Sequence, residues 1–197
     1  LPFHGRRKGR LAPFSGHGLF AGGISRMNEA FGQAIFDLRI FLDFLINDQG
    51  SPSVGATGIS LGGYTTALLA ATDERLAFAI PNVPLVSIAD LVMEWHPISI
   101  ATRTIMRAFK LSLPDVRRLV AVHSPLSYPV KLPKERLLII GGVGDRMAPP
   151  KHASLLWEHW DRPEIHWFAG SHLVHLGRNA YHTRMRHFLR EIEFLRG

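Results

Sequence analysis

The chain has 197 residues, of which 46% are hydrophobic and 20% charged, so it can bury a substantial core and is not disordered. It contains no cysteine, which excludes disulfides, thiolate metal sites and a cysteine nucleophile. Lysine and arginine exceed aspartate and glutamate by 23 − 16 = 7. These basic residues are spread along the chain without interleaved aromatic residues, which favours a solvated basic surface over a nucleic-acid site.

Predicted helices and strands alternate along the chain. Residues 1–3 read as the end of a strand and residues 11–23, rich in glycine and proline, as a loop. Apolar residues at helical spacing predict helices at 25–47, 64–72, 150–160 and 176–196, with Ser25 as the N-cap of the first, and two or three short helices over 86–122. Short apolar runs predict strands at 54–59, 76–80, 137–140 and 164–168. This alternation predicts one α/β domain with a mostly parallel sheet and helices on both faces. No apolar run approaches the roughly 20 residues that span a bilayer.

The stretch GISLGG at 58–63 raises the first functional hypothesis. Ser60 lies in G-x-S-x-G between a predicted strand and a predicted helix, which is the context of a nucleophile elbow. The missing side chains of Gly58 and Gly62 would leave room for close backbone. The N–H of Leu61 would face an oxyanion. An ordinary strand–helix turn is the alternative, because glycine and serine are common.

An acid and a base follow Ser60 in the order that such a site requires. Asp145 lies in a glycine-rich loop just after the buried strand 137–140, although a turn aspartate bonded to its own backbone would look the same. His172 comes directly after the strand 164–168 and is the predicted base. His175 is its rival, and His166, inside the strand, fits a packed or surface histidine better.

These three segments together resemble the α/β-hydrolase superfamily. The resemblance rests on GISLGG at 58–63, GGVGDRMAPP at 141–150 and AGSHLVHLG at 169–177, and it extends over essentially the whole chain. It implies esterase, lipase, thioesterase, peptidase or acyltransferase chemistry without choosing among them.

The front of the chain departs from the superfamily pattern. That fold has eight strands with the elbow after the fifth, whereas here only the strand end at 1–3 precedes the helix 25–47. The first three strands would then be absent, leaving a sheet of about five or six strands. The second oxyanion donor would be lost or replaced by a backbone N–H near His4 and Gly5. The exposed sheet edge would need a cover, for which a homodimer is one solution.

The resemblance also places a helical cap over the site at 86–122. Its apolar side chains could line an acyl pocket or simply pack the cap onto the domain: Leu91, Val92, Met93, Trp95, Ile98, Ile100, Ile105, Met106 and Phe109.

The sequence therefore predicts a carboxylesterase that forms an acyl-enzyme on Ser60, with His172 as base, Asp145 as orienting acid, and Leu61 and Gly5 as oxyanion donors. The substrate would be a small acyl ester. No cofactor or metal is expected, because the glycines match no nucleotide motif and the histidines lack H-E-x-x-H. Acyl transfer, or a truncated hydrolase that only binds, are the alternatives. No leader is visible, so the compartment is open, with the cytoplasm favoured.

Overall fold

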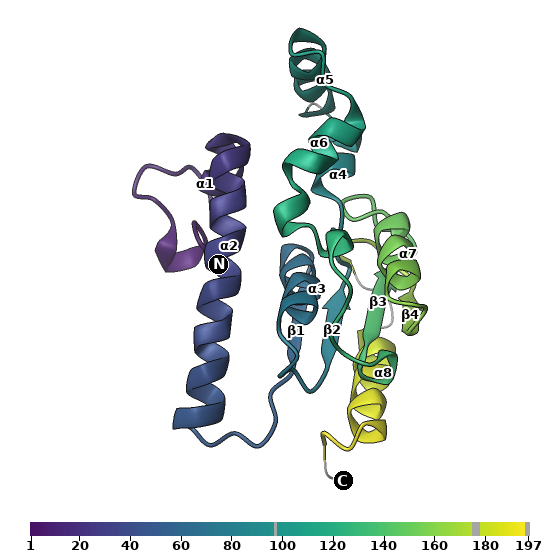
Figure 1. The fold of residues 1–197 in the computed structure, drawn as a ribbon. Coiled ribbons are helices and arrows are strands. Elements are labelled where there is room, and N and C mark those ends of the chain that lie inside the picture. Colours follow the sequence, from purple (N-terminus) through teal and green to yellow (C-terminus); the bar gives the residue numbers. More distant parts are fainter. Residues whose placement is uncertain (97, 175–177, 196–197) are drawn as a thin grey trace.

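The computed structural model describes residues 1–96, 98–174 and 178–195, and within these the chain forms one four-stranded parallel sheet. The strands follow one another in sequence order across the sheet (Figure 1): β1 (Ala56–Ile59), β2 (Ala79–Asn82), β3 (Leu138–Gly142) and β4 (Glu164–Phe168). All three pairings are parallel, which brings the carboxyl ends of the strands to one edge.

The predicted sheet of five or six strands is therefore wrong in number, although its α/β class and parallel direction are confirmed. Residues 1–3 form a turn instead of a strand end. Pro2 has no N–H to donate to a ladder, and Phe3 has a φ of 62°, outside the extended region. His4 N–H closes the turn on the Leu1 carbonyl at 3.3 Å. Within the described residues, no strand precedes β1.

Eight α-helices and several short turns of helix surround the sheet in the described part of the chain. The α-helices are α1 (His17–Ala21), α2 (Gly23–Asp43), α3 (Leu61–Thr72), α4 (Ile88–Glu94), α5 (Ile98–Ala108), α6 (Leu113–Leu119), α7 (Pro150–His159) and α8 (Arg178–Glu191). Single 3-10 turns lie at Gly5–Arg7, Ala121–His123, Pro125–Ser127 and Lys134–Arg136, and α2 continues into a π turn at Phe44–Asp48.

The start of the first long helix differs from the prediction. α1 occupies part of the predicted loop 11–23, and α2 begins at Gly23 with Gly22 as its N-cap. Ser25 therefore lies inside α2 instead of capping it. Gly23 has a φ of 79°, a conformation open to glycine, so the glycine pair makes the bend between the two helices.

The two faces of the sheet carry separate parts of the core. α3 and α7 cover one face, where Ala79, Leu137 and Ile139 point, and α8 covers the other, where Ile80 and Ile140 point (Figure 1). This alternation follows from the two-residue period of a strand. Such near-continuous apolar strands are typical of parallel sheets buried on both sides.

The region between β2 and β3 contains α4, α5 and α6, which agrees with the predicted short helices over 86–122. Both α4 and α6 begin with a serine cap, since Ser87 and Ser112 each accept a hydrogen bond from a backbone N–H three residues on. α6 packs through Val116 against α2 and α3. α5 projects away from the rest of the molecule, at the top of Figure 1.

One edge of the sheet is formed by β1. Its outer backbone groups have no strand partner in the part of the chain described, and Ile59 is 54% exposed. The predicted exposed edge therefore lies at β1, and the homodimer that would cover it stays a prediction. None of the helices in the described residues has the length and apolar character needed to cross a bilayer.

Candidate active site

Ser60 stands at the carboxyl end of β1, where the strand turns directly into α3. Its backbone has φ 58° and ψ −114°, a conformation that a residue with a side chain rarely adopts. Two hydrogen bonds fix it: Ser60 N–H donates to the Asn82 carbonyl on β2, and Tyr64 N–H donates to the Ser60 carbonyl, each at 2.9 Å. The sheet and the helix thus hold the strained turn from both sides.

Close backbone contacts explain two of the three glycines around Ser60. A Cβ on Gly58 would lie 2.4 Å from the Gly62 carbonyl oxygen, and a Cβ on Gly63 would lie 2.8 Å from the Asn82 carbonyl oxygen. A Cβ on Gly62 would meet nothing within 4 Å. The spatial reason expected for Gly58 is therefore confirmed, whereas the one expected for Gly62 is wrong, since Gly62 only supplies the backbone that approaches Gly58. Gly63 was not singled out from the sequence.

Asp145 follows β3 and is fully buried. Its side chain is 0% exposed, and its Oδ1 accepts hydrogen bonds from the N–H groups of Met147 and Ala148, each at 2.8 Å. Its Oδ2 lies 2.6 Å from Nδ1 of His172. The carboxylate thus makes the local backbone bonds of a turn aspartate and contacts the histidine at the same time. The local bonds of a turn aspartate are therefore present, and the role of Asp145 as an orienting acid stays a prediction.

His172 is brought to Asp145 by the pairing of two loops. Val143 N–H donates to the Phe168 carbonyl at 3.1 Å, and Gly144 N–H donates to the Gly170 carbonyl at 2.9 Å. These bonds extend the β3–β4 pairing beyond both strands and carry the histidine, whose side chain is 8% exposed, to the carboxylate. Local sequence gave no sign of this loop pairing.

The rival bases named from the sequence are His166 and His175. His166 is in the middle of β4, paired in register with Ile140, and so is away from the carboxyl ends of the strands. His175 lies outside the described residues. Ser60 Oγ has no hydrogen-bond partner among the residues described, so its contact with His172 stays a prediction.

The two predicted oxyanion donors differ in their surroundings. Leu61 is the first residue of α3, where N–H groups have no acceptor within the helix. Gly5 has a φ of 54°, is exposed, and donates its N–H to Ser15 Oγ at 3.0 Å. An oxyanion at Gly5 would have to replace that serine hydroxyl.

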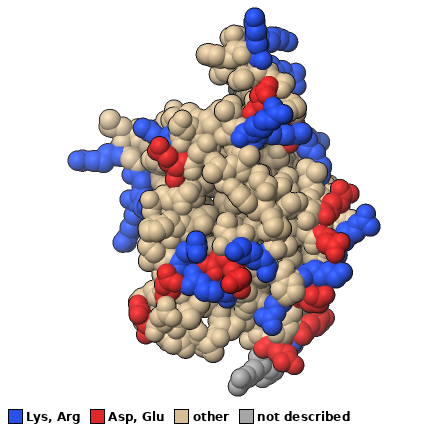
Figure 2. All heavy atoms as spheres, in the orientation of Figure 1, with Lys and Arg blue, Asp and Glu red and all other residues tan. Residues whose placement is uncertain are grey.

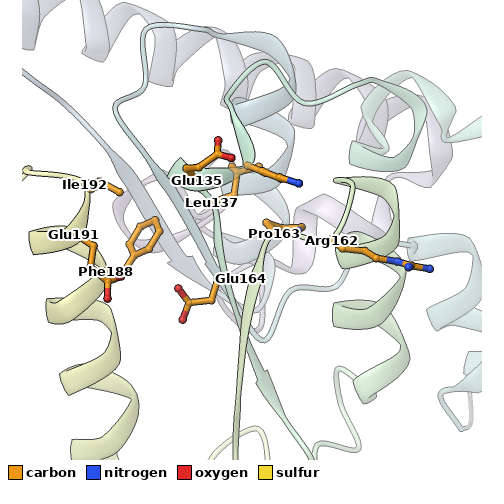
Figure 3. Close-up of a pocket in the computed structure, with 9 residues that line it drawn as sticks. Glu135, Leu137, Arg162, Pro163, Glu164, Phe188, Glu191 and Ile192 are labelled. Atoms are coloured by element: carbon orange, nitrogen blue, oxygen red, sulfur yellow. The ribbon is translucent and has the colours of Figure 1, made fainter.

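A separate hollow of about 390 Å³ lies at the opposite end of the sheet (Figure 3). Leu137 and Glu164, at the amino ends of β3 and β4, line it together with Phe188 and Glu191 of α8. Arg184 pairs with both glutamates there. Because Ser60 and Asp145 follow the carboxyl ends of their strands, this hollow is not part of their site.

Solved structures with similar folds are esterases and peptidases. An acetyl xylan esterase from Paenibacillus sp. R4 superposes with a TM-score of 0.63 at 18% identity, over 81% of this chain and 52% of the esterase. A puromycin-hydrolyzing peptidase of Mycobacterium tuberculosis gives 0.55 at 16% identity, over 80% of this chain and 25% of the peptidase. The chain has the α/β-hydrolase fold.

Sequence comparison adds a longer relative. The uncharacterized protein Rv2627c of Mycobacterium tuberculosis is 31% identical over 179 residues, which is 87% of this chain. The chain spans 40% of the length of that relative. No protein-family model matches the chain.

Proposed function

We propose that the chain is a serine hydrolase that cleaves carboxylic esters with Ser60, His172 and Asp145. The observation that carries the proposal is the 2.6 Å contact between the buried Asp145 carboxylate and His172 Nδ1. Both groups follow the carboxyl ends of their strands, and Ser60 follows the carboxyl end of β1 in the same sheet. Ligand sites of open α/β sheets lie at that edge.

The contact supports a separate role for each nitrogen of His172. If Nδ1–H donates to Asp145, Nε2 is the unprotonated nitrogen of the ring and would accept the Ser60 proton. Ser60 Oγ then bonds to the acyl carbon, and the carbonyl electrons move to oxygen, where the Leu61 N–H stabilises them. Collapse breaks the bond to the alcohol, which leaves with the proton from His172. Water, deprotonated by His172, then releases the acid and restores Ser60.

Esters are favoured over amides by the state of the oxyanion donors. Of the two predicted donors, Leu61 N–H is available without rearrangement, whereas Gly5 N–H already bonds to Ser15. Losing one donor of such a pair costs about 10²–10³ in rate. An ester tolerates this loss better than an amide, since its carbonyl carbon is more electrophilic and an alkoxide leaves more readily than an unprotonated amide nitrogen.

The test is hydrolysis of p-nitrophenyl acetate by the purified chain, beside an acetyl p-nitroanilide as the matched amide. Ser60→Ala and His172→Ala should each reduce ester turnover by at least about 10³-fold. Ser53→Ala and His166→Ala replace the same residue types away from the site and should not. Added glycerol tests acyl transfer, which would yield a glycerol ester in place of free acid.

Three other outcomes of this assay would change the proposal. Activity that survives Ser60→Ala would overturn the assignment of the nucleophile. Faster cleavage of the anilide would make the chain a peptidase-like enzyme instead of an esterase. A folded chain that cleaves neither substrate would favour the non-catalytic binding module.

A further inference from the structure

The buried carboxylates of this protein are paired, whereas the buried amide of Asn82 is not. Figure 2 shows acidic and basic groups side by side at several places on one face of the molecule. Beneath the surface, Asp73 bonds to Arg75 and Asp145 to His172. Asn82 is 3% exposed and its Oδ1 is fully buried, yet its side chain has no hydrogen-bond partner in the part of the chain described. An unpaired buried amide lowers stability, and in a native structure it calls for a water, a ligand or a role in chemistry.

Asn82 lies beside the candidate acid, at the same end and on the same face of the sheet. It is the last residue of β2 and pairs in register with Ile140 of β3. Because side chains alternate along a strand, Asn82 shares with Ile80 the face that α8 covers. Gly142 comes two residues after Ile140 and therefore faces the same way. A Cβ on Gly142 would lie 3.5 Å from the Cβ of Asp145.

The backbone around Asn82 is strained and firmly held. Val83 has a φ of 40°, which a β-branched residue rarely adopts, and Ser60 has a φ of 58° at the end of the adjoining strand. The Asn82 carbonyl accepts the Ser60 N–H at 2.9 Å, and Val83 N–H donates to the Ile140 carbonyl at 2.8 Å. Strained residues held in this way cluster at active sites. Asn82 is thus fixed between the strand that leads to Ser60 and the strand that precedes Asp145.

The carboxylate of Asp145 has room for one more hydrogen bond. An ionised carboxylate offers about four acceptor positions. The N–H groups of Met147 and Ala148 occupy two on Oδ1, and His172 occupies one on Oδ2. The amide of Asn82 carries two N–H donors that have no acceptor among the described residues. An acceptor position and unused donors therefore lie on adjacent strands.

We propose that Asn82 is a positioning residue for the pair formed by Asp145 and His172. An N–H of its amide donates to a buried water, and that water donates to Asp145 Oδ2. A buried water needs two or more polar partners, which the amide and the carboxylate supply. The bridge would keep Oδ2 aimed at Nδ1 of His172 while the ring gains the Ser60 proton, without touching the substrate. This inference rests on the proposed function.

The test is hydrolysis of p-nitrophenyl acetate by two Asn82 variants from about pH 5 to about pH 9. Asn82→Leu keeps the size of the side chain but removes the donor. Its kcat should fall about 10–100-fold at every pH, because a bond to a charged group is lost, while KM and the unfolding temperature change little.

Asn82→Asp separates a donor from a group that only fills space. The new carboxyl group can donate to the water only while it is protonated. As the pH rises it loses that proton and repels Asp145, so turnover relative to the parent chain should fall. A ratio that stays constant with pH would overturn the role of Asn82 as a donor.

Asn28→Leu is the matched control. Asn28 Oδ1 is also buried without a partner, but this residue lies on α2 and donates to the Leu119 carbonyl at 3.0 Å. The control should keep the kcat and the pH profile of the parent chain, even if it unfolds at a lower temperature.

Two further results decide between this inference and the proposed function. If Ser60→Ala abolishes turnover but Asn82→Leu keeps the parent kcat, or raises KM alone, the positioning role is overturned and the hydrolase stands. If the folded parent chain is inactive, or Ser60→Ala stays active, the proposed function fails and this inference fails with it.

Discussion

Two histidines of this protein are held in opposite ways. His172 contacts the buried carboxylate of Asp145 at the edge of the sheet where strands end. His123 lies beneath the surface, 2% exposed, stacked on Phe31 with ring centroids 4.4 Å apart. Its Nδ1 lies 2.5 Å from the hydroxyl of Tyr64, which also donates to the His123 carbonyl oxygen at 2.8 Å.

The difference lies in the charge of the partner. Burial among neutral groups lowers the pKa of His123 to about 4, so the ring is kept neutral near neutral pH. In the proposed mechanism, the carboxylate of Asp145 instead faces the ring that accepts the Ser60 proton. Burial alone thus produces a packing histidine, and an acidic partner at a strand end is what suits a histidine for proton transfer.

The largest expected effect is the loss of ester turnover when the acidic partner of His172 is replaced. Asp145→Asn keeps an oxygen for the N–H groups of Met147 and Ala148 but removes the charge facing His172. Ester turnover should fall by about 10³–10⁴-fold, while the thermal unfolding temperature changes little. The pair of measurements is esterase kinetics and calorimetry on the same samples. Unchanged turnover would mean that Asp145 is only a turn aspartate.

A smaller effect should appear in the dependence of stability on pH. The folded pKa of His123, about 4, lies below the usual 6.5, so the unfolded chain takes up a proton first as the pH falls. Stability is therefore fully present above about pH 6.5 and is lost as the pH falls toward 4. Between pH 7 and pH 5 the loss should be about 2 kcal/mol from this histidine.

Urea unfolding at several pH values measures this loss. His152 is 0% exposed, and burial lowers its pKa to about 4 as well. It should therefore add a similar loss of stability. His123→Gln should flatten the pH dependence by the share of that one residue. His187→Gln, at an exposed position on α8, is the matched control. If both variants follow the parent curve, His123 is not held neutral.

The smallest effect concerns the hydroxyl beside His123. Tyr64→Phe keeps the ring but removes the partner of two buried polar atoms, and should reduce the free energy of unfolding by about 1–2 kcal/mol. Its effect on ester turnover should be far smaller than that of Asp145→Asn. A loss of turnover without a loss of stability would instead connect this pair to the reaction, and would remove the contrast between the two histidines.

Periodicity and chain order predict much of this molecule. The segment 54–59 with its glycines predicted the elbow strand, and the position of His172 after the last strand predicted its place near Asp145. These features depend on neighbours in sequence or on the common edge of a parallel sheet. The prediction of a strand end at residues 1–3 is wrong, because apolar residues beside a proline fit a strand end and the sequence does not show the positive φ of Phe3.

Contacts between distant segments could not be foreseen. Tyr64 and His123 meet only because the 3-10 turn at 121–123 packs on α2 and α6, which brings it beside α3. The bond from Gly5 to Ser15, which engages a predicted oxyanion donor, depends on a loop with no periodic pattern. Sequence patterns predict the helices and strands and their order. Hydrogen bonds between distant segments depend on how these elements pack together.

The pairing of β2 with β3 has a consequence for how the candidate site is assembled. Asn82 pairs with Ile140, which closes the longest stretch of chain of the three strand pairings described. Such non-local closures form slowly, because the entropy of the loop is lost before the contact is gained. Ser60 belongs to the segment before this closure, and Asp145 and His172 to the segment after it. We therefore expect the strand that carries Ser60 and the strands that precede Asp145 and His172 to come together during folding only when this pairing forms.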